Sequence, residues 1–150
     1  MNLVKQYFTS DDLDQITHAV TASERQTAGE IRVEIRQRRS RQERQMSVEH
    51  IARREFEALG MTGTANRTGV MLFLLLEDKE FCILADEGIH AHVDPETWTT
   101  IATSMADKFG RRQFRDGLIE AVKAVGDVLR RHVPRSAGDR NELSDDVEVR

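Results

Sequence analysis

The fold is decided by a hairpin-like stretch that reads GVMLFLLL over Gly69–Leu76, EDKE over Glu77–Glu80 and FCILA over Phe81–Ala85. A continuous apolar run bounded by turn residues is typical of a central strand that is buried on both faces. The polar segment that follows is short enough to form a tight turn. The second apolar run is therefore expected to return antiparallel to the first.

The segment before this hairpin supplies a second strand and a crossover helix. Residues Glu30–Gln37 read EIRVEIRQ, and this period of two predicts a strand with one face in solvent, near a sheet edge. Ser47 is placed to cap a helix that ends at Gly60. Because that helix connects the two strands as a crossover, we expect them to run parallel.

Helical patterns flank these strands on both sides. One helix is expected to begin at Asp11, capped by Ser10, and to end near Ala28-Gly29, while Asp94-Pro95 is a strong start for another, with Trp98 in its buried face. A last helix runs from about Phe114 to before Pro134. The predicted fold class is α/β: a three-layer α/β/α sandwich whose small mixed sheet, a parallel pair plus an antiparallel hairpin strand, is flanked by about four helices.

The chain is long enough for one domain, predicted over residues 1–134, followed by a polar acidic tail over 135–150 that is expected to be disordered. The tail places Glu142, Asp145 and Asp146 beside Leu143. Acidic segments with interspersed apolar residues can dock in basic grooves of a partner, but most are solvated termini, and the sequence favours the second interpretation.

Charge and hydropathy exclude several functions. A net charge of −4 argues against a nucleic-acid partner, which usually requires a surplus of Lys and Arg. The arginine-rich segment Arg38–Gln45 could contact RNA or lipid, but the absence of interleaved aromatic residues favours a mobile solvated loop. The run Gly69–Leu76 is too short to span a bilayer and no secretory signal is recognisable, so we expect a cytoplasmic protein that meets membranes only through a partner.

The single cysteine and a pair of histidines could be reactive or bind metal, but the sequence favours structural roles for both. Cys82 is the single cysteine, which excludes an internal disulfide, and its apolar surroundings in sequence favour a buried structural thiol. His90 and His92 have a spacing that can bind a transition metal, but ordinary loop histidines are favoured because no third strong ligand lies nearby in the sequence.

The predicted topology brings one set of oxygen-bearing side chains to a single edge of the sheet. The parallel pair begins there and the antiparallel strand ends there, which gathers five residues: Glu30, Asn66, Thr68, Asp86 and Glu87. Carboxylate, amide and hydroxyl oxygens are the ligands that hard cations prefer, so Glu30, Asp86 and Glu87 are candidate ligands for Ca²⁺ or Mg²⁺. Carboxylates are also common at strand ends because they are solvated there, and this alternative stays open.

Four segments, in this order along the chain, are similar to the TPM domain family: TAGEIRV over Thr27–Val33, RTGV over Arg67–Val70, DEGIH over Asp86–His90 and FRDGL over Phe114–Leu118. The family is named after a thylakoid lumen protein, a photosystem II repair protein and a nematode receptor modulator. The resemblance covers Phe8 to Pro134 and is nearest to compact bacterial members. It implies an α/β/α sandwich, a divalent-cation site at one edge of the sheet and, for some plant members, acid phosphatase activity.

These observations favour a divalent-cation-binding domain that acts as an interaction or regulatory module, with a protein partner that is associated with a membrane. The alternative is a metal-dependent phosphatase that hydrolyses phosphomonoesters with a metal-activated water, and it rests on the resemblance alone. The sequence contains no Walker-type phosphate loop, no Gly-x-Ser-x-Gly motif and no His-Glu-x-x-His motif, so binding is favoured over catalysis.

Overall fold

The structure, a computed structural model, describes residues 2–63, 67–134 and 147–149. Its sheet has the strand order β3-β2-β1-β4. Strand β1 (Glu30–Arg36) pairs in parallel with β2 (Gly69–Leu75), and β2 pairs antiparallel with β3 (Glu80–Ala85). The parallel pair and the returning hairpin strand predicted from the sequence are confirmed.

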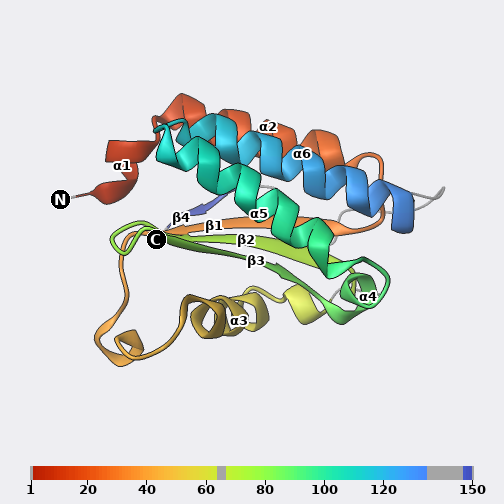
Figure 1. Cartoon of the computed structure of the whole chain (residues 1–150), viewed down its shortest axis with the longest axis horizontal. Helices are drawn as coiled ribbons and strands as arrows, with labels where there is room; N and C mark the ends of the chain where they lie inside the picture. The colour runs from red at the N-terminus through yellow and green to blue at the C-terminus, as the bar shows by residue number, and fades with distance from the viewer. Residues whose placement is uncertain (1, 64–66, 135–146, 150) are drawn as a thin grey trace.

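Helices cover both faces of this sheet (Figure 1). One face carries α2 (Ser10–Glu24), α5 (Pro95–Gly110) and α6 (Phe114–His132), and the other carries α3 (Val48–Ala58). Shorter elements complete the described chain: α1 (Leu3–Tyr7), α4 (Glu87–His90) and the 3₁₀ turns η1 (Arg41–Glu43) and η2 (Met61–Gly63). Because the side chains of β2 alternate between two separate apolar cores, the three-layer α/β/α sandwich is confirmed.

Most helix starts follow from capping side chains. The Ser47 side chain accepts a hydrogen bond from the His50 amide, and Asp94 accepts one from the Glu96 amide, as predicted. The first long helix starts at Ser10 rather than Asp11, because Thr9 exchanges hydrogen bonds with Asp12 in a capping box, and it ends at Glu24, well before Ala28.

Among the described residues, no helix has the length and apolar character needed to cross a membrane.

The polar face of β1 differs from its prediction. The sequence pattern indicated a face in solvent, but Glu30 and Glu34 are only 3% and 0% exposed. The polar positions of β1 share their side of the sheet with Gly69 and Phe73 of β2, which is the side covered by α3. A period of two therefore separated the two faces correctly, while the solvent exposure of the polar face was wrong.

The arginine-rich connection over Arg38–Gln45 combines solvent-exposed side chains with bonds to the rest of the molecule. Its residue Glu43 is buried and bonds to Arg36 at the end of β1. Arg39 donates hydrogen bonds to the Met46 carbonyl oxygen and to carboxylates of the β2–β3 turn. Most of the segment is exposed to solvent, as predicted, while Arg39 and Glu43 tie it to the rest of the molecule.

Only part of the predicted tail can be compared with the structure. Residues 135–146 and 150 lie outside the described residues. The remaining part includes strand β4 (Glu148–Val149), which pairs in parallel with β1 beside Glu34 and Ile35. An Arg32–Glu148 ion pair of 3.0 Å accompanies this pairing. These two residues extend the sheet beside β1.

Candidate functional site

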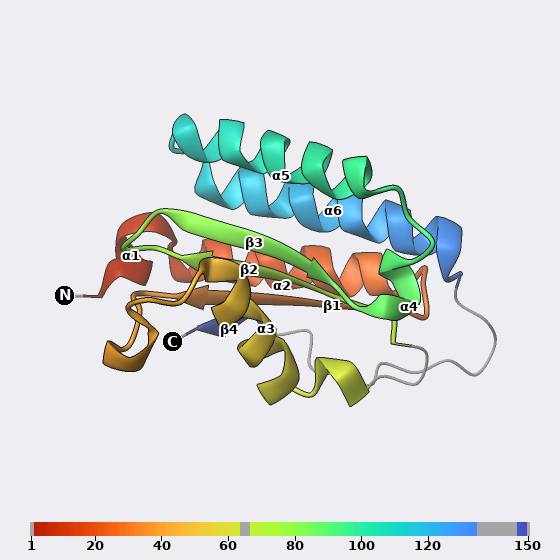
Figure 2. The same cartoon turned by 60° about the horizontal axis from the view of Figure 1, so that its bottom comes forward.

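The predicted edge is formed by the first residues of β1 and β2 and by the residues that follow β3. We call it the strand-end edge and define it by Glu30, Thr68, Gly69, Asp86 and Glu87. Glu30 is opposite Gly69 in the parallel register, and the Asp86 amide donates a 2.8 Å hydrogen bond to the Gly69 carbonyl oxygen. Backbone pairing alone therefore brings three distant parts of the sequence together, beside the short helix α4 (Figure 2).

A fork-shaped ion pair dominates this edge. The Nε and Nη2 atoms of Arg67 donate hydrogen bonds of 2.8 Å to the two carboxylate oxygens of Asp86. The Asp86 side chain is only 5% exposed, whereas that of Arg67 is 41% exposed. Hydrogen bonds to Asp86 raise the pKa of Arg67 above its already high ordinary value. The buried carboxylate is therefore neutralised by a guanidinium group that itself reaches solvent.

Asp86 also has a local structural role. Its Oδ1 atom accepts a 2.8 Å hydrogen bond from the Glu87 amide, at the start of helix α4. The Gly88 amide in turn donates to the Arg67 carbonyl oxygen over 2.7 Å. The two residues of the ion pair are thus positioned by the backbone as well as by each other.

The other predicted ligands occupy contrasting surroundings. Glu30 and Thr68 are buried, with exposures of 3% and 5%. Glu87 has a 74% exposed side chain and lies 3.3 Å from the Arg67 Nη1 atom. Asn66 lies outside the described residues. The edge therefore offers one buried carboxylate within the strand pairing, one buried carboxylate held by arginine and one carboxylate in solvent.

Within the part of the chain that the structure describes, no group of three or more His, Cys, Asp and Glu side chains is arranged so as to hold a metal ion. His90 ends helix α4, and His92 follows it; both are exposed. The interpretation of the pair as two ordinary histidines stays a prediction.

A small polar cavity of about 190 Å³ opens beside the strand-end edge and reaches α3. Side chains of both charges line it, among them Arg53, Glu57, Thr62, Arg67, Glu87 and His90. Charged groups of both signs around one hollow are suited to binding a polar or charged surface, because each can be paired on contact.

Cys82 takes no part in this edge. It is half-buried in β3, against the core formed with α3. Burial, with a smaller contribution from the nearby charge of Glu49, raises the pKa of its thiol to about 11. The thiol is therefore protonated near neutral pH and is a poor nucleophile, in agreement with the structural role that the sequence suggested.

Arg67 was missed as a site residue in the sequence, where it appeared in the RTGV segment without a role of its own. The hairpin pattern contained a usable signal. Once Val70 is paired with Ala85, Gly69 lies opposite Asp86 and the residues just before β2 come within reach of it. An arginine two positions before a strand, with an aspartate just after the partner strand, is then a candidate ion pair.

Several residues of the four short segments noted above position the backbone of this region. The Thr27 hydroxyl bonds to the Val133 carbonyl oxygen after α6 and accepts a 3.0 Å hydrogen bond from the Gly29 amide. A Cβ atom at Gly29 would lie 2.9 Å from Leu129, and one at Gly69 would lie 2.9 Å from Met61. These glycines therefore allow the strand starts to approach the side chains of Leu129 in α6 and Met61 in η2 closely.

Comparisons with known proteins agree with this architecture. The family model of the TPM domain matches residues 2–128. The chain is similar to the solution structure of BA42 protein from the psychrophilic bacterium Bizionia argentinensis, with 27% identity, a TM-score of 0.86 and 96% of each chain covered. It shares its fold with the N-terminal domain of the cg2496 protein from Corynebacterium glutamicum, at 12% identity, a TM-score of 0.61, and coverage of 81% of this chain and 74% of that one. No curated protein matches the chain.

Proposed function

Because the chain belongs to the TPM domain family, we propose that it is a divalent-cation-binding interaction module whose binding surface is the strand-end edge. The observation that carries the proposal is the Arg67–Asp86 ion pair, in which a nearly buried carboxylate faces a partly exposed guanidinium. A group of this kind can exchange its internal partner for an external cation, because the internal partner can move into solvent.

The side chains of the edge fit a cation that replaces Arg67. Asp86 and Glu87 supply the oxygen ligands that Ca²⁺ and Mg²⁺ require. In the structure, however, both oxygens of Asp86 are bonded to Arg67. These residues therefore fit a cation that displaces the Arg67 guanidinium. They fit poorly a cation that binds while the guanidinium stays in place. Glu30, the third predicted ligand, supports the proposal less directly, because it is buried at the start of β1.

The proposed protein partner meets the same surface. Glu87 and His90 are exposed, Arg67 is partly exposed, and all three line the polar cavity described above. Cation binding at Asp86 would release the guanidinium of Arg67 and change the charge pattern that a partner meets, which is the basis of a regulatory role. The association of this partner with a membrane is proposed from the family resemblance.

Titration with Ca²⁺ tests the cation proposal. In ¹H–¹⁵N correlation spectra, we expect saturable shifts confined to the amides around Glu30, Thr68 and Asp86–Ile89. Replacing Arg67 with glycine should tighten binding by roughly fivefold to tenfold, because the competing cation is removed. Glycine is the appropriate replacement, since Arg67 has a φ of 56°, where a residue without Cβ is not strained.

Two further variants complete this experiment. Asp86→Asn keeps a side chain that can cap α4 but removes the charge, so it should abolish the shifts. Arg38→Ala removes the same charge from an exposed Arg38–Glu77 pair elsewhere and should leave the affinity unchanged. The cation part of the proposal would be ruled out if the wild type and the Arg67→Gly variant bind Ca²⁺ with equal affinity. It would also be ruled out if neither protein shows chemical-shift changes at millimolar Ca²⁺ and Mg²⁺.

Phosphomonoester hydrolysis remains a prediction from the family resemblance. The strand-end edge supports binding more directly, because the fork of Arg67 already satisfies the carboxylate that would have to act as a ligand or base. If hydrolysis of a chromogenic phosphate ester by the purified chain depends on added metal and is lost in Asp86→Asn, the enzyme alternative would be favoured instead.

A further inference from the structure

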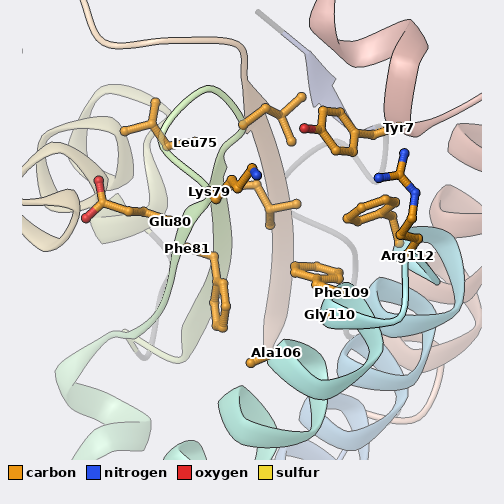
Figure 3. Close-up of a pocket in the computed structure, with 12 residues that line it drawn as sticks. Tyr7, Leu75, Lys79, Glu80, Phe81, Ala106, Phe109, Gly110 and Arg112 are labelled. Carbon is orange, nitrogen blue, oxygen red and sulfur yellow. The ribbon is translucent and has the colours of Figure 1, made fainter.

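A second, larger cavity lies at the other end of the sheet, near the β2–β3 turn. Its volume is about 420 Å³, within the range of small-molecule sites. Three separate parts of the chain enclose it: α1, the β2–β3 hairpin, and the end of α5 with the start of α6 (Figure 3). We call it the hairpin pocket and define it by its apolar lining, which is Tyr7, Leu74, Leu76, Phe81, Phe109 and Phe114.

The aromatic side chains of the hairpin pocket form a continuous wall. The rings of Tyr7 and Phe114 are perpendicular with centroids 4.7 Å apart, and Phe114 lies 5.7 Å from Phe109. Phe109 in turn packs edge-on against Phe81 at 5.6 Å. Because each ring is held by its neighbours, the apolar surface is formed before any ligand arrives, which lowers the entropic cost of binding.

Two cationic side chains lie at the mouth of the hairpin pocket. Lys79 is in the β2–β3 turn and Arg112 follows α5; both line the cavity and both are exposed. Among the described residues, neither belongs to an ion pair within 4.0 Å. Of the carboxylates nearest to Lys79 in the sequence, Glu77 pairs with Arg38, while Asp78 and Glu80 share the single charge of Arg39. With Lys79 and Arg112 included, four cations face three carboxylates, so the mouth carries a net positive charge.

The orientation of the side chains agrees with this charge pattern. Glu80 also lines the cavity, but Figure 3 shows its carboxylate directed to the side opposite Phe109 and Arg112. Lys79 and Arg112 share an uncommon backbone conformation, with φ angles of 55° and 62°. Non-glycine residues in this region are strained, and such residues often occur at functional sites. Here both belong to the rim of one cavity.

We propose that the hairpin pocket binds a small amphipathic carboxylate, with a medium-length apolar chain among the aromatic side chains and the carboxylate group between Lys79 and Arg112. The volume and lining suit the apolar chain, and the two unpaired cations suit a single anionic group. This site is independent of the strand-end edge, which lies at the opposite end of the strands (Figure 2).

Binding of octanoate tests the proposal directly. Spectra of the full chain should show saturable shifts at Tyr7, at Lys79–Phe81 and at Ala106–Phe109. Affinity should rise about threefold for each methylene added between hexanoate and octanoate, since each one buries further apolar surface. Octanol, which has the chain without the charge, should bind several-fold more weakly, and acetate should not bind detectably.

Three variants separate the contributions of the two cations and of the apolar cavity to octanoate binding. Lys79→Gly and Arg112→Gly each remove a cation at a position where glycine is unstrained, so both should remain folded. Each should weaken octanoate binding roughly two- to fivefold, the range for exposed ion pairs. Ala106→Trp places a large side chain at an exposed lining position of the cavity and should abolish binding.

Arg111→Ala is the matched control, because Arg111 is adjacent in the sequence but pairs with Asp107 and does not line the cavity. Its octanoate affinity should equal that of the wild type. The proposal is overturned if octanoate produces no saturable shifts at the lining residues at low millimolar concentration, if octanol binds as tightly as octanoate, or if both glycine variants keep wild-type affinity.

Discussion

Replacing Arg36 with methionine is expected to lower the free energy of unfolding by about 3–5 kcal/mol. The guanidinium of Arg36 bonds to Glu43 at 2.5 and 3.2 Å and to Glu55 at 3.3 Å. The side chains of these three residues are only 11%, 11% and 14% exposed. Methionine fills a similar volume, but it leaves two carboxylates buried without this cation, and equilibrium unfolding in urea measures the cost.

Two comparisons identify the source of this loss. Arg38→Met makes the same substitution at an exposed pair with Glu77 and should change the free energy of unfolding by less than about 1 kcal/mol. Adding Glu43→Gln and Glu55→Gln to Arg36→Met should restore part of the lost stability, because the buried charges are gone. If the triple variant is no more stable than the single one, buried charge is not the cause.

The free energy of unfolding should depend on pH differently in the wild type and in the Arg36→Met variant. Burial by itself raises the pKa of Glu43, but hydrogen bonds from Arg36 and Ser40 outweigh it and lower the pKa to about 2, from an ordinary value of 4.5. In the wild type this contribution to stability is complete above about pH 4.5 and is lost as the pH falls toward 2. In Arg36→Met the pKa of Glu43 is no longer lowered by Arg36, while burial and the hydrogen bonds of Ser40 remain. Acidification from about pH 4.5 toward 2 should therefore cost the wild type more stability than the variant and narrow the difference between their free energies of unfolding.

Replacing Gly126 with valine should lower the free energy of unfolding by about 3 kcal/mol. Gly126 lies in α6 where this helix packs against the end of α2, and a Cβ atom there would lie 2.7 Å from the Cβ and Oγ atoms of Ser23. Since the Ser23 Cβ atom is fixed to its backbone, one helix has to move. The loss should be visible as a lower denaturation midpoint, despite the better helix propensity of valine.

The matched control is Gly110→Val at the end of α5. A Cβ atom at Gly110 would have nothing within 4 Å, so this variant should differ from the wild type by less than about 1 kcal/mol. Combining Gly126→Val with Ser23→Gly should recover part of the loss by making room in α2. Equal stabilities of the Gly126→Val and Gly110→Val variants would show that the α2–α6 contact tolerates a larger separation.

The arrangement of the sheet could be predicted because local patterns and chain connection agreed. The apolar run of β2 identified a central strand, and the helix capped by Ser47 fixed the parallel direction of β1. Helix α1 was missed because its five residues are too few to display a helical period, although Asn2 caps it. Strand β4 was missed because its two residues gain their stability from pairing with β1 rather than from their own sequence.

The burial of the polar face of β1 could not be read from alternation alone. A period of two shows which side chains share a face, but not what covers that face. Here the cover comes from α3, from η1 through Glu43 and from β4 through Glu148, which are distant in the sequence. The two arginines that the strand contributes to this face bond to carboxylates of those distant segments, Arg32 to Glu148 and Arg36 to Glu43 and Glu55.

The two candidate sites also differ in how far the sequence predicts them. The position of the strand-end edge followed from topology, because it depends on strand direction only. The Arg67–Asp86 pair depends on side-chain reach, and the hairpin pocket depends on aromatic residues from three distant segments. The segments that resembled the family contributed packing residues such as Gly29 as well as Asp86, so a short motif did not by itself separate structure from chemistry.

The packing of α2 against α6 has a consequence for synthesis on the ribosome. Ile16 and Val20 of α2 share a core with Leu118, Val122 and Leu129 of α6. At translation rates of about 5–20 residues per second, α6 follows α2 by roughly five to twenty seconds. During that interval the apolar side of α2 lacks its native cover, so the nascent chain exposes an aggregation-prone surface until most of its length has been made.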